Sequence, residues 1–317
     1  MFHNQSFIAQ LLRFTISIVL AFILVLGYPS QALAQNRFQI ALQQIKSLFV
    51  PRGENKGTPT GRVRGGAGRG QCPVIASVDT AETQLTALVP TISNPLDKET
   101  LRLKPKSSQI VWGKTFEAYP TFWFYIPYEY EESELEAKFV LLDEDKRIVT
   151  GPIFLKPSKD NSSGKPRLAK FTLPKQQPLE IGKQYNWYFS IICDERKPSR
   201  NPGVAGWIQR VKLDIIAPKN YLYYAEKGIW YDTVTRLADS RAAIQQTQID
   251  NIDIAPPIGD KSLTTPPSQI QIEEDWLAVF RFLKWSDENQ IDEKLINEIA
   301  NSPIVELSPV RESEIEI

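Results

Sequence analysis

Eight short apolar segments between residues 84 and 213 constrain the fold more than any other feature of this chain. They are rich in Val, Ile and aromatic residues, and Pro, Gly and Asp punctuate the chain between them. No long helical periodicity separates them, which argues against a parallel α/β sheet and favours a sandwich. We predict strands at Gln84–Val89, Gln109–Trp112, Thr121–Ile126, Ala137–Asp143, Arg147–Leu155, Arg167–Leu173, Tyr185–Cys193 and Gly206–Leu213.

A local motif before the seventh of these strands refines the prediction. Leu179, Gly182 and Tyr185 stand at three-residue steps. This spacing resembles the tyrosine corner of immunoglobulin-like and fibronectin-like sandwiches, in which the Tyr hydroxyl bonds to upstream backbone. The sequence therefore predicts a mainly β chain with α-helices: an antiparallel immunoglobulin/fibronectin-like β-sandwich over residues 72–217, followed by a small helical C-terminal subdomain.

The N-terminus has the three-part pattern of a secretory signal peptide. An uncharged apolar run at residues 14–26 follows Arg13, and Ala32 and Ala34 supply the small residues before a cut at Gln35. The run has thirteen residues, whereas spanning a bilayer takes about 20. We predict that residues 1–34 are removed and that the chain is exported to the periplasm, cell envelope or exterior. The alternative is an uncleaved anchor at residues 14–26, which would be the only reason to expect membrane association.

Histidine and cysteine usage limits the chemistry of the mature chain. The only histidine, His3, lies in the predicted signal peptide, which excludes Ser-His-Asp triads, Cys-His pairs and His-based zinc sites. The two cysteines are too few for an all-cysteine zinc site. In an oxidising compartment we expect Cys72 and Cys193 to form a disulfide that closes a loop of about 120 residues; the alternative is two buried free thiols. We predict no catalytic residues, no metal and no cofactor.

The remaining segments flank the predicted sandwich. Residues 35–71 join an amphipathic helical stripe to a Gly- and Arg-rich flexible linker, and residues 218–302 are predicted to be helical around a Pro-rich linker at 250–270. Residues 303–317 are expected to be a frayed tail. Lys+Arg and Asp+Glu are equal at 37 each, so no global field would recruit nucleic acid, and the Arg-Gly segment carries no interleaved aromatic.

Five stretches together resemble a known family. They are residues 64–70, 120–127, 182–191, 204–211 and 228–232. They are similar to an exported cyanobacterial family catalogued only as a domain of unknown function, number nine hundred and twenty-eight, over about residues 65 to 300. The resemblance implies an exported cyanobacterial protein and supplies no catalytic residues.

The densest candidate site is an aromatic cluster at residues 122–130. On a strand, Trp123 and Tyr125 share one face, and Tyr128 and Tyr130 follow. These four residues are candidate ligand contacts for a sugar or a Pro-rich peptide. The alternative is that both faces of the strand are core and that the helical tail covers one of them.

Acidic side chains gather at Glu129–Glu136 and at Asp143–Asp145. Paired carboxylates can hydrolyse glycosides or bind calcium; the alternative is a solvated loop and a hairpin turn. The leading hypothesis is a non-enzymatic binding or assembly module of the cell envelope, with an envelope protein or glycan as partner. The alternatives are a carboxylate-dependent hydrolase of envelope polysaccharide and a membrane-anchored scaffold. The sequence does not indicate an oligomeric state.

Overall fold

The computed structural model describes residues 37–45, 60–62, 84–93, 109–127, 135–158, 166–214, 220–250, 269–283 and 293–310. The strands are β1 (Thr60–Gly61), β2 (Thr86–Ala87), β3 (Thr91–Ser93), β4 (Gln109–Thr115), β5 (Thr121–Ile126), β6 (Ala137–Leu142), β7 (Ile148–Pro157), β8 (Arg167–Thr172), β9 (Gln184–Ile191), β10 (Gly203–Arg210) and β11 (Ile304–Pro309). The helices are α3 (Tyr221–Glu226), α4 (Trp230–Asp250), α5 (Gln269–Phe282), α6 (Glu293–Ala300), the 3-10 turn η2 (Pro198–Arg200) and a helix over 37–45. The predicted signal peptide, most of the Gly- and Arg-rich linker and most of the Pro-rich linker lie outside the described residues. The expectation of a flexible linker is wrong for residues 60–62, because β1 pairs with β4 and Arg62 forms a bridge with Ala205. No described helix is long and apolar enough to cross a membrane.

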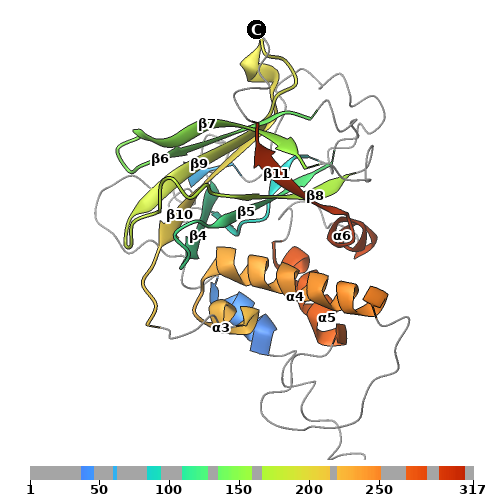
Figure 1. Ribbon diagram of the computed structural model, residues 1–317. Coiled ribbons are helices and arrows are strands. Elements are labelled where there is room, and N and C mark those ends of the chain that lie inside the picture. Colours follow the sequence, from blue (N-terminus) through green and yellow to red (C-terminus); the bar gives the residue numbers. More distant parts are fainter. Residues whose placement is uncertain are drawn as a thin grey trace, which may run out of the picture.

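The strands form one continuous, strongly curled sheet (Figure 1). Its order is β1-β4-β10-β9-β6-β7-β11-β8-β5-β2, with β3 beside β4. Most pairs are antiparallel, but β10 runs parallel to β4 and β11 runs parallel to β8. The combination of a β-sheet with accompanying helices is therefore confirmed, but the structure is mixed α/β rather than mainly β. The immunoglobulin/fibronectin-like antiparallel sandwich is not confirmed, because the hydrogen-bonded path is mixed and unbroken.

Strand β11 makes the path continuous, and it comes from the segment predicted to be a frayed tail. Residues 304–309 pair with β7 on one side and with β8 on the other. The expectation of a frayed end is wrong for these residues. The alternation of buried Val305 and Leu307 with exposed Glu306 explains the pairing, because it matches the two-residue period of a strand with one buried face.

The first hydrophobic core fills the inside of the curl. Its members come from nearly every long strand, and aromatic rings dominate it: Phe122, Phe124, Phe139, Phe171, Trp187 and Phe189 are all at most 1% exposed. Phe124 and Phe189 stack with their ring centroids 3.8 Å apart. The indole of Trp187 donates a hydrogen bond to the hydroxyl of Tyr231, 2.8 Å away, so the start of α4 closes one end of this core.

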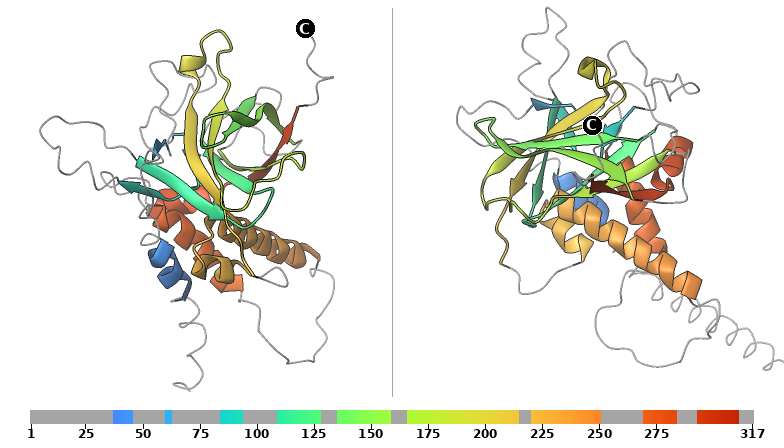
Figure 2. Two further views of the ribbon diagram at one scale, coloured as in Figure 1. Left: turned by 90° about the vertical axis from the view of Figure 1, so that its left-hand side faces the viewer. Right: turned by 45° about the horizontal axis from the view of Figure 1, so that its top comes forward.

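A second core lies between the sheet and a layer of helices. Figures 1 and 2 show α4 running along the sheet, with α3 and the helix over 37–45 near its beginning and α5 beside it. Strand β5 belongs to both cores: Phe122 and Phe124 point inside the curl, while Trp123 and Tyr125 point into the helical layer. The predicted amphipathic stripe is confirmed for residues 37–45, because Phe38, Leu42 and Ile45 are buried in this second core.

Gly228 divides the first half of the predicted helical segment, before the Pro-rich linker, into α3 and α4. Its φ of 70° is in the left-handed region that favours glycine. The N–H of Gly228 donates to Ala225 O at 2.9 Å, and the N–H of Ile229 donates to Tyr224 O at 2.9 Å, which ends α3. The turn redirects the chain, so that Trp230 and Tyr231 enter the two cores from the first turn of α4.

Arg241 fastens the helices to one another. It is 8% exposed on α4. Its Nε donates to Glu273 Oε2 on α5 at 2.8 Å, and its Nη2 donates to Asn301 Oδ1 after α6 at 3.0 Å. Its guanidinium also lies 5.8 Å from the ring centre of Trp276. A buried charge is tolerated when it is paired and hydrogen-bonded, as Arg241 is. Because these contacts run from α4 to α5 and to the residue after α6, they fix the arrangement of the three helices.

Candidate binding face of the sheet

The outer face of β10, β9, β6 and β7 points away from the helices (Figures 1 and 2). Burial alternates along β6: Ala137, Phe139 and Leu141 are buried, while the intervening residues are half-buried. Because side chains on a strand alternate between faces, Lys138, Val140 and Leu142 lie on the outer face. No described helix covers this part of the sheet.

Exposed apolar side chains gather on this outer face. Ile148 is 65% exposed, Tyr188 45% and Phe154 38%. Val140 pairs with Tyr188, and Leu142 pairs with Ile148. Residues directly opposite one another share a face with their Cβ atoms about 5 Å apart, so these side chains are neighbours. We call Val140, Leu142, Ile148, Phe154 and Tyr188 the open face.

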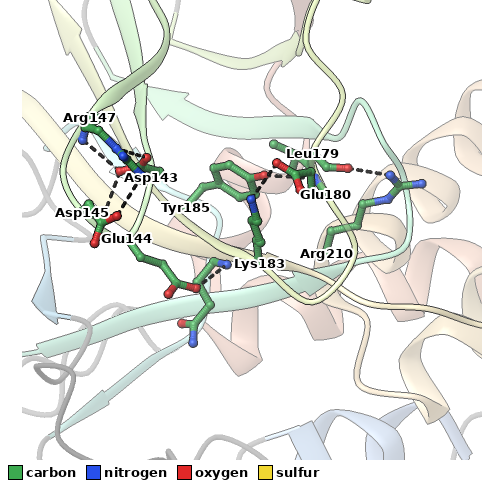
Figure 3. A network of polar contacts seen from close by, with 10 residues as sticks. Asp143, Glu144, Asp145, Arg147, Leu179, Glu180, Lys183, Tyr185 and Arg210 are labelled. Atoms are coloured by element: carbon green, nitrogen blue, oxygen red, sulfur yellow. Dashed lines mark hydrogen bonds and ion pairs between the residues drawn. The ribbon is translucent and has the colours of Figure 1, made fainter.

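A charged hairpin turn borders the open face at the end of β6 and β7 (Figure 3). Asp143 Oδ1 accepts from the backbone N–H groups of Asp145 and Arg147, each at 2.9 Å. The Arg147 guanidinium donates to Asp143 Oδ2 and to Asp145 Oδ2, both at 2.8 Å. The hydrogen bond from the Arg147 backbone, then that from its side chain, keeps the pKa of Asp143 below its usual value. The predicted acidic hairpin turn is confirmed, and Arg147 binds the carboxylates of Asp143 and Asp145.

The tyrosine corner lies next to this turn (Figure 3). The backbone N–H of Glu180 donates to the hydroxyl of Tyr185 at 3.0 Å, which confirms the predicted bond to upstream backbone. Lys183 Nζ donates to Glu180 Oε1 at 2.7 Å, and this bond raises the pKa of Lys183. The N–H of Gln184 donates to Glu144 Oε1 at 3.1 Å, which ties the hairpin turn to the start of β9. The edge of the open face is thus held in place by side-chain bonds to backbone.

Replacing Tyr185 by phenylalanine should remove the corner bond without changing the ring, which is 3% exposed. The Glu180 N–H would lose its partner, so we expect the free energy of unfolding to fall by about 1–1.5 kcal/mol. Urea unfolding followed by circular dichroism measures this loss. Tyr188→Phe is the control, because Tyr188 is exposed on the same strand; equal losses in the two variants would contradict a structural role for the corner.

Two of the four aromatic residues proposed from sequence as ligand contacts are not on the surface. Trp123 is 3% exposed and Tyr125 is 4% exposed, both beneath the helical layer. The Trp123 indole donates to Thr235 Oγ1 on α4 at 3.0 Å. Burial raises the pKa of Tyr125 to about 12. The alternative interpretation, core on both faces of the strand, is the one that the structure supports, and an open aromatic platform at these two residues is excluded. Tyr128 and Tyr130 lie outside the described residues.

Two carboxyl groups are buried deep in the molecule, which the sequence did not indicate. Asp275 and Asp232 are each 3% exposed. Asp275 accepts from the Tyr221 hydroxyl at 2.7 Å and from Gln271 Nε2 at 2.8 Å, and burial raises its pKa to about 6. Within the described residues, no group of three or more acidic, Cys or His side chains is arranged to hold a metal ion.

Asp232 joins the first turn of α4 to the end of β4. Its Oδ2 accepts from the Thr115 hydroxyl at 2.8 Å and from the Phe116 N–H at 3.1 Å. Its Oδ1 is buried without a hydrogen-bond partner. Burial raises the pKa of Asp232 to about 6, against these two bonds, which lower it.

The raised pKa of Asp232 predicts a pH-dependent effect of Asp232→Asn. The folded state holds the Asp232 proton more tightly than the unfolded chain, so this group lowers stability as the pH rises from about 4 to about 6. The loss amounts to roughly 2–3 kcal/mol and is constant above that range. Asn cannot ionise, so Asp232→Asn should not lose this stability as the pH rises. Between pH 4 and pH 7 the wild type should therefore lose roughly 2–3 kcal/mol relative to Asp232→Asn. Denaturant unfolding at several pH values measures it, with exposed Asp239→Asn on the same helix as control. A difference that is constant over this range would contradict the prediction.

Cys193 lies just after β9, beside a polar loop. Its N–H donates to Asn201 Oδ1 at 2.8 Å, and the N–H of Asp194 donates to the same oxygen at 2.9 Å. No cysteine among the described residues is free. Cys72 lies outside the described residues, so the pairing of Cys72 with Cys193 stays a prediction.

Most strands of the sheet lie in a region of the chain that matches a known family. The family model described as Domain of Unknown Function (DUF928) matches residues 64–252, which is more than half of the 317-residue chain. The chain belongs to the DUF928 family. No curated protein and no solved structure gives a significant match to it.

The match divides this DUF928 protein into two parts. Strands β2 to β10 and helices α3 and α4 lie inside the matched residues, so the open face and the tyrosine corner belong to the family domain. Helices α5 and α6 and strand β11 lie beyond it. The open face could have been anticipated from the sequence only in part: Val140 and Leu142 stand at the alternate positions of a predicted strand, where polar residues are expected.

Proposed function

We propose that this DUF928 protein is an exported, non-enzymatic binding module of a cyanobacterial cell envelope that docks a protein partner on the open face. The observation that supports this most is the exposure of Ile148, Phe154 and Tyr188 on the sheet face that the described helices leave uncovered. Contiguous exposed apolar side chains on a soluble domain are typical of interaction sites.

The composition of the open face favours a protein over a glycan. Ile148, Val140 and Leu142 offer no hydrogen-bonding groups, whereas a sugar needs such groups for its hydroxyls. An apolar centre beside a polar rim is the usual anatomy of a protein–protein interface, and the hairpin turn of Asp143 to Arg147 supplies such a rim. Arg147 binds the carboxylates of Asp143 and Asp145 in that turn, and Asp232 and Asp275 are buried. These contacts argue against the alternative of a carboxylate-dependent hydrolase at these residues, whereas residues 129–134 lie outside the described residues.

The finer assignment to an immunoglobulin-like sandwich is part of this proposal. In that fold one sheet has strands G, F, C and C′ in sequence across it, and the other pairs E with B. Strands β10, β9, β6 and β7 have the first order, and β8 pairs with β5 as the second requires. Tyr185 of the tyrosine corner lies at the start of β9, the strand that corresponds to F. Strand β11 then takes the position beside E that strand D has in the immunoglobulin fold.

Site-specific photo-crosslinking in the producing cells tests the open face. A photoreactive phenylalanine analogue is placed at position 188, on the open face, or at position 270, where the native Ile270 is 73% exposed on α5. We expect a discrete protein adduct from position 188 and none from position 270. Ile148→Ser should abolish the adduct at 188, whereas Ile270→Ser should leave it unchanged. Equal adducts from both positions, or an adduct that survives Ile148→Ser, would overturn the proposal.

A further inference from the structure

Strand β11 occupies a slot that the rest of the sheet leaves between β7 and β8. Three residues of β11 pair with β7 and three with β8. Among the described residues no other strand joins the two sides at this point. Without β11 the sheet would separate into β1-β4-β10-β9-β6-β7, with β3 beside β4, and β8-β5-β2. The slot is therefore bounded by one edge of β7 and one edge of β8, which would both be unpaired there without β11. Strand β11, which follows α6 in the chain, fills it.

The slot binds its occupant by main-chain bonds and side-chain pockets. Ser158 N–H donates to Glu306 O at 2.8 Å, and Val310 N–H donates to Phe154 O at 2.9 Å. Val305 and Leu307 are each 2% exposed and belong to the first core. This is the chemistry of strand addition, in which main-chain bonds give affinity and pockets for alternate side chains give specificity.

The walls and the occupant of the slot belong to different parts of the chain. Strands β7 and β8 lie inside the residues that match the family, and β11 lies about fifty residues beyond the end of that match at 252. Only Asn301, Ser302 and Pro303 connect β11 to α6. Helix α6 is held separately, because Ile296, Ile299 and Ala300 are buried in the second core. Strand β11 is thus held by the sheet and helix α6 by the second core, and only three residues connect them.

We propose that the slot between β7 and β8 also accepts β11 from a second copy of this chain, which yields strand-exchanged dimers. The same Val305 and Leu307 side chains would fill the same pockets in either arrangement, so exchange needs no new complementary surface. A three-residue connection reaches about 10 Å. If each α6 stays on its own chain while its β11 enters the slot of the other chain, the ends of the two α6 helices must therefore lie close together. The β11 strand of the same chain is always close to the slot, so it competes strongly with the β11 strand of another chain. Exchange between chains is therefore expected at high protein concentration.

The ion pair between β11 and β8 offers a direct test on the full-length protein. Lys170 Nζ lies 3.8 Å from Glu306 Oε2, and both side chains are accessible. Chains labelled with ¹⁴N and ¹⁵N are mixed, unfolded, refolded together at high concentration and treated with a carbodiimide, which joins this amine to this carboxylate. Monomers and dimers are then separated, and the linked peptides are identified by mass spectrometry. We expect about half of the linked peptides from the dimer to combine the two isotopes, as random two-fold exchange requires, and those from the monomer to combine none.

Two outcomes would overturn the proposal: dimers whose Lys170–Glu306 links never combine isotopes, or no dimer at the highest soluble concentration. Val305→Asp should abolish mixed links, because it puts a charge into the apolar pocket. Glu306→Gln should remove the link and leave the dimer fraction unchanged, which keeps the proposal testable if Val305→Asp does not fold. Ile148→Ser on the open face should leave mixed links unchanged, so the failure of one proposal is distinguishable from the failure of the other.

Discussion

Replacing Trp276 by alanine should lower the free energy of unfolding by about 3–5 kcal/mol, the range for truncating a large buried side chain. Trp276 on α5 is fully buried at the centre of the second core. Its ring makes edge contacts with Trp123 of the sheet, at 6.3 Å between centroids, and with Phe280, at 5.1 Å. Its indole donates to the carbonyl of Ala300 at 2.8 Å, and the truncation leaves that buried carbonyl without its donor.

Two variants on α5 separate the contributions. Trp276→Phe keeps an aromatic ring and loses the indole hydrogen bond, so its cost should be smaller, about 1–3 kcal/mol. Ile270→Ser, at a position 73% exposed, should cost within about 0.5 kcal/mol of zero. Urea unfolding followed by circular dichroism compares the three variants with the wild type. If Trp276→Ala cost no more than Ile270→Ser, the helical layer would not be packed on the sheet as described.

The sequence predicts the elements of this fold better than their assembly. Seven of the eight predicted strands coincide with strands of the sheet to within a few residues, and Thr121–Ile126 matches in full. Alternation and turn residues are local signals, and they also divide the aromatic residues of β5 correctly between two faces. The remaining segment, Gln84–Val89, contains only the two residues of β2, because its neighbours pack into the cores without regular pairing.

What the sequence could not predict depends on contacts between distant segments. The pairing of β11 with β7 and β8 joins residues more than 130 positions apart. A six-residue strand that follows Pro303 and ends at Pro309 carries too weak a local pattern to reveal this pairing. The same limit applies to the candidate site. Periodicity places Trp123 and Tyr125 on one face of β5, but only the packing of α4 and α5 decides that this face is covered while the outer face of β10, β9, β6 and β7 is open.

Removing the predicted Cys72–Cys193 disulfide should cost about 4–5 kcal/mol, because in the chain-entropy model a bond closing a loop of about 120 residues restricts the unfolded chain by that amount. Cys193 follows β9, whose inward residues line the first core, so an anchor at this point acts on the most buried part of the sheet. The loss is measured by urea unfolding of Cys193→Ser under non-reducing conditions, and reductant should destabilise the wild type to the same extent and leave the variant unaffected.

A double-mutant cycle decides whether the two cysteines act as a pair. If they are bonded to each other, Cys72→Ser, Cys193→Ser and the double variant should all lose the same stability, because either single substitution already removes the whole cross-link. Separate losses that add in the double variant would instead indicate two independently buried thiols. Intact mass of the protein from envelope fractions, alkylated with and without reduction, completes the test. Two alkylations only after reduction support the bond, and a mass that begins at Gln35 supports the oxidising compartment that the bond requires. A mass that retains Met1 with two thiols alkylated without reduction would contradict both.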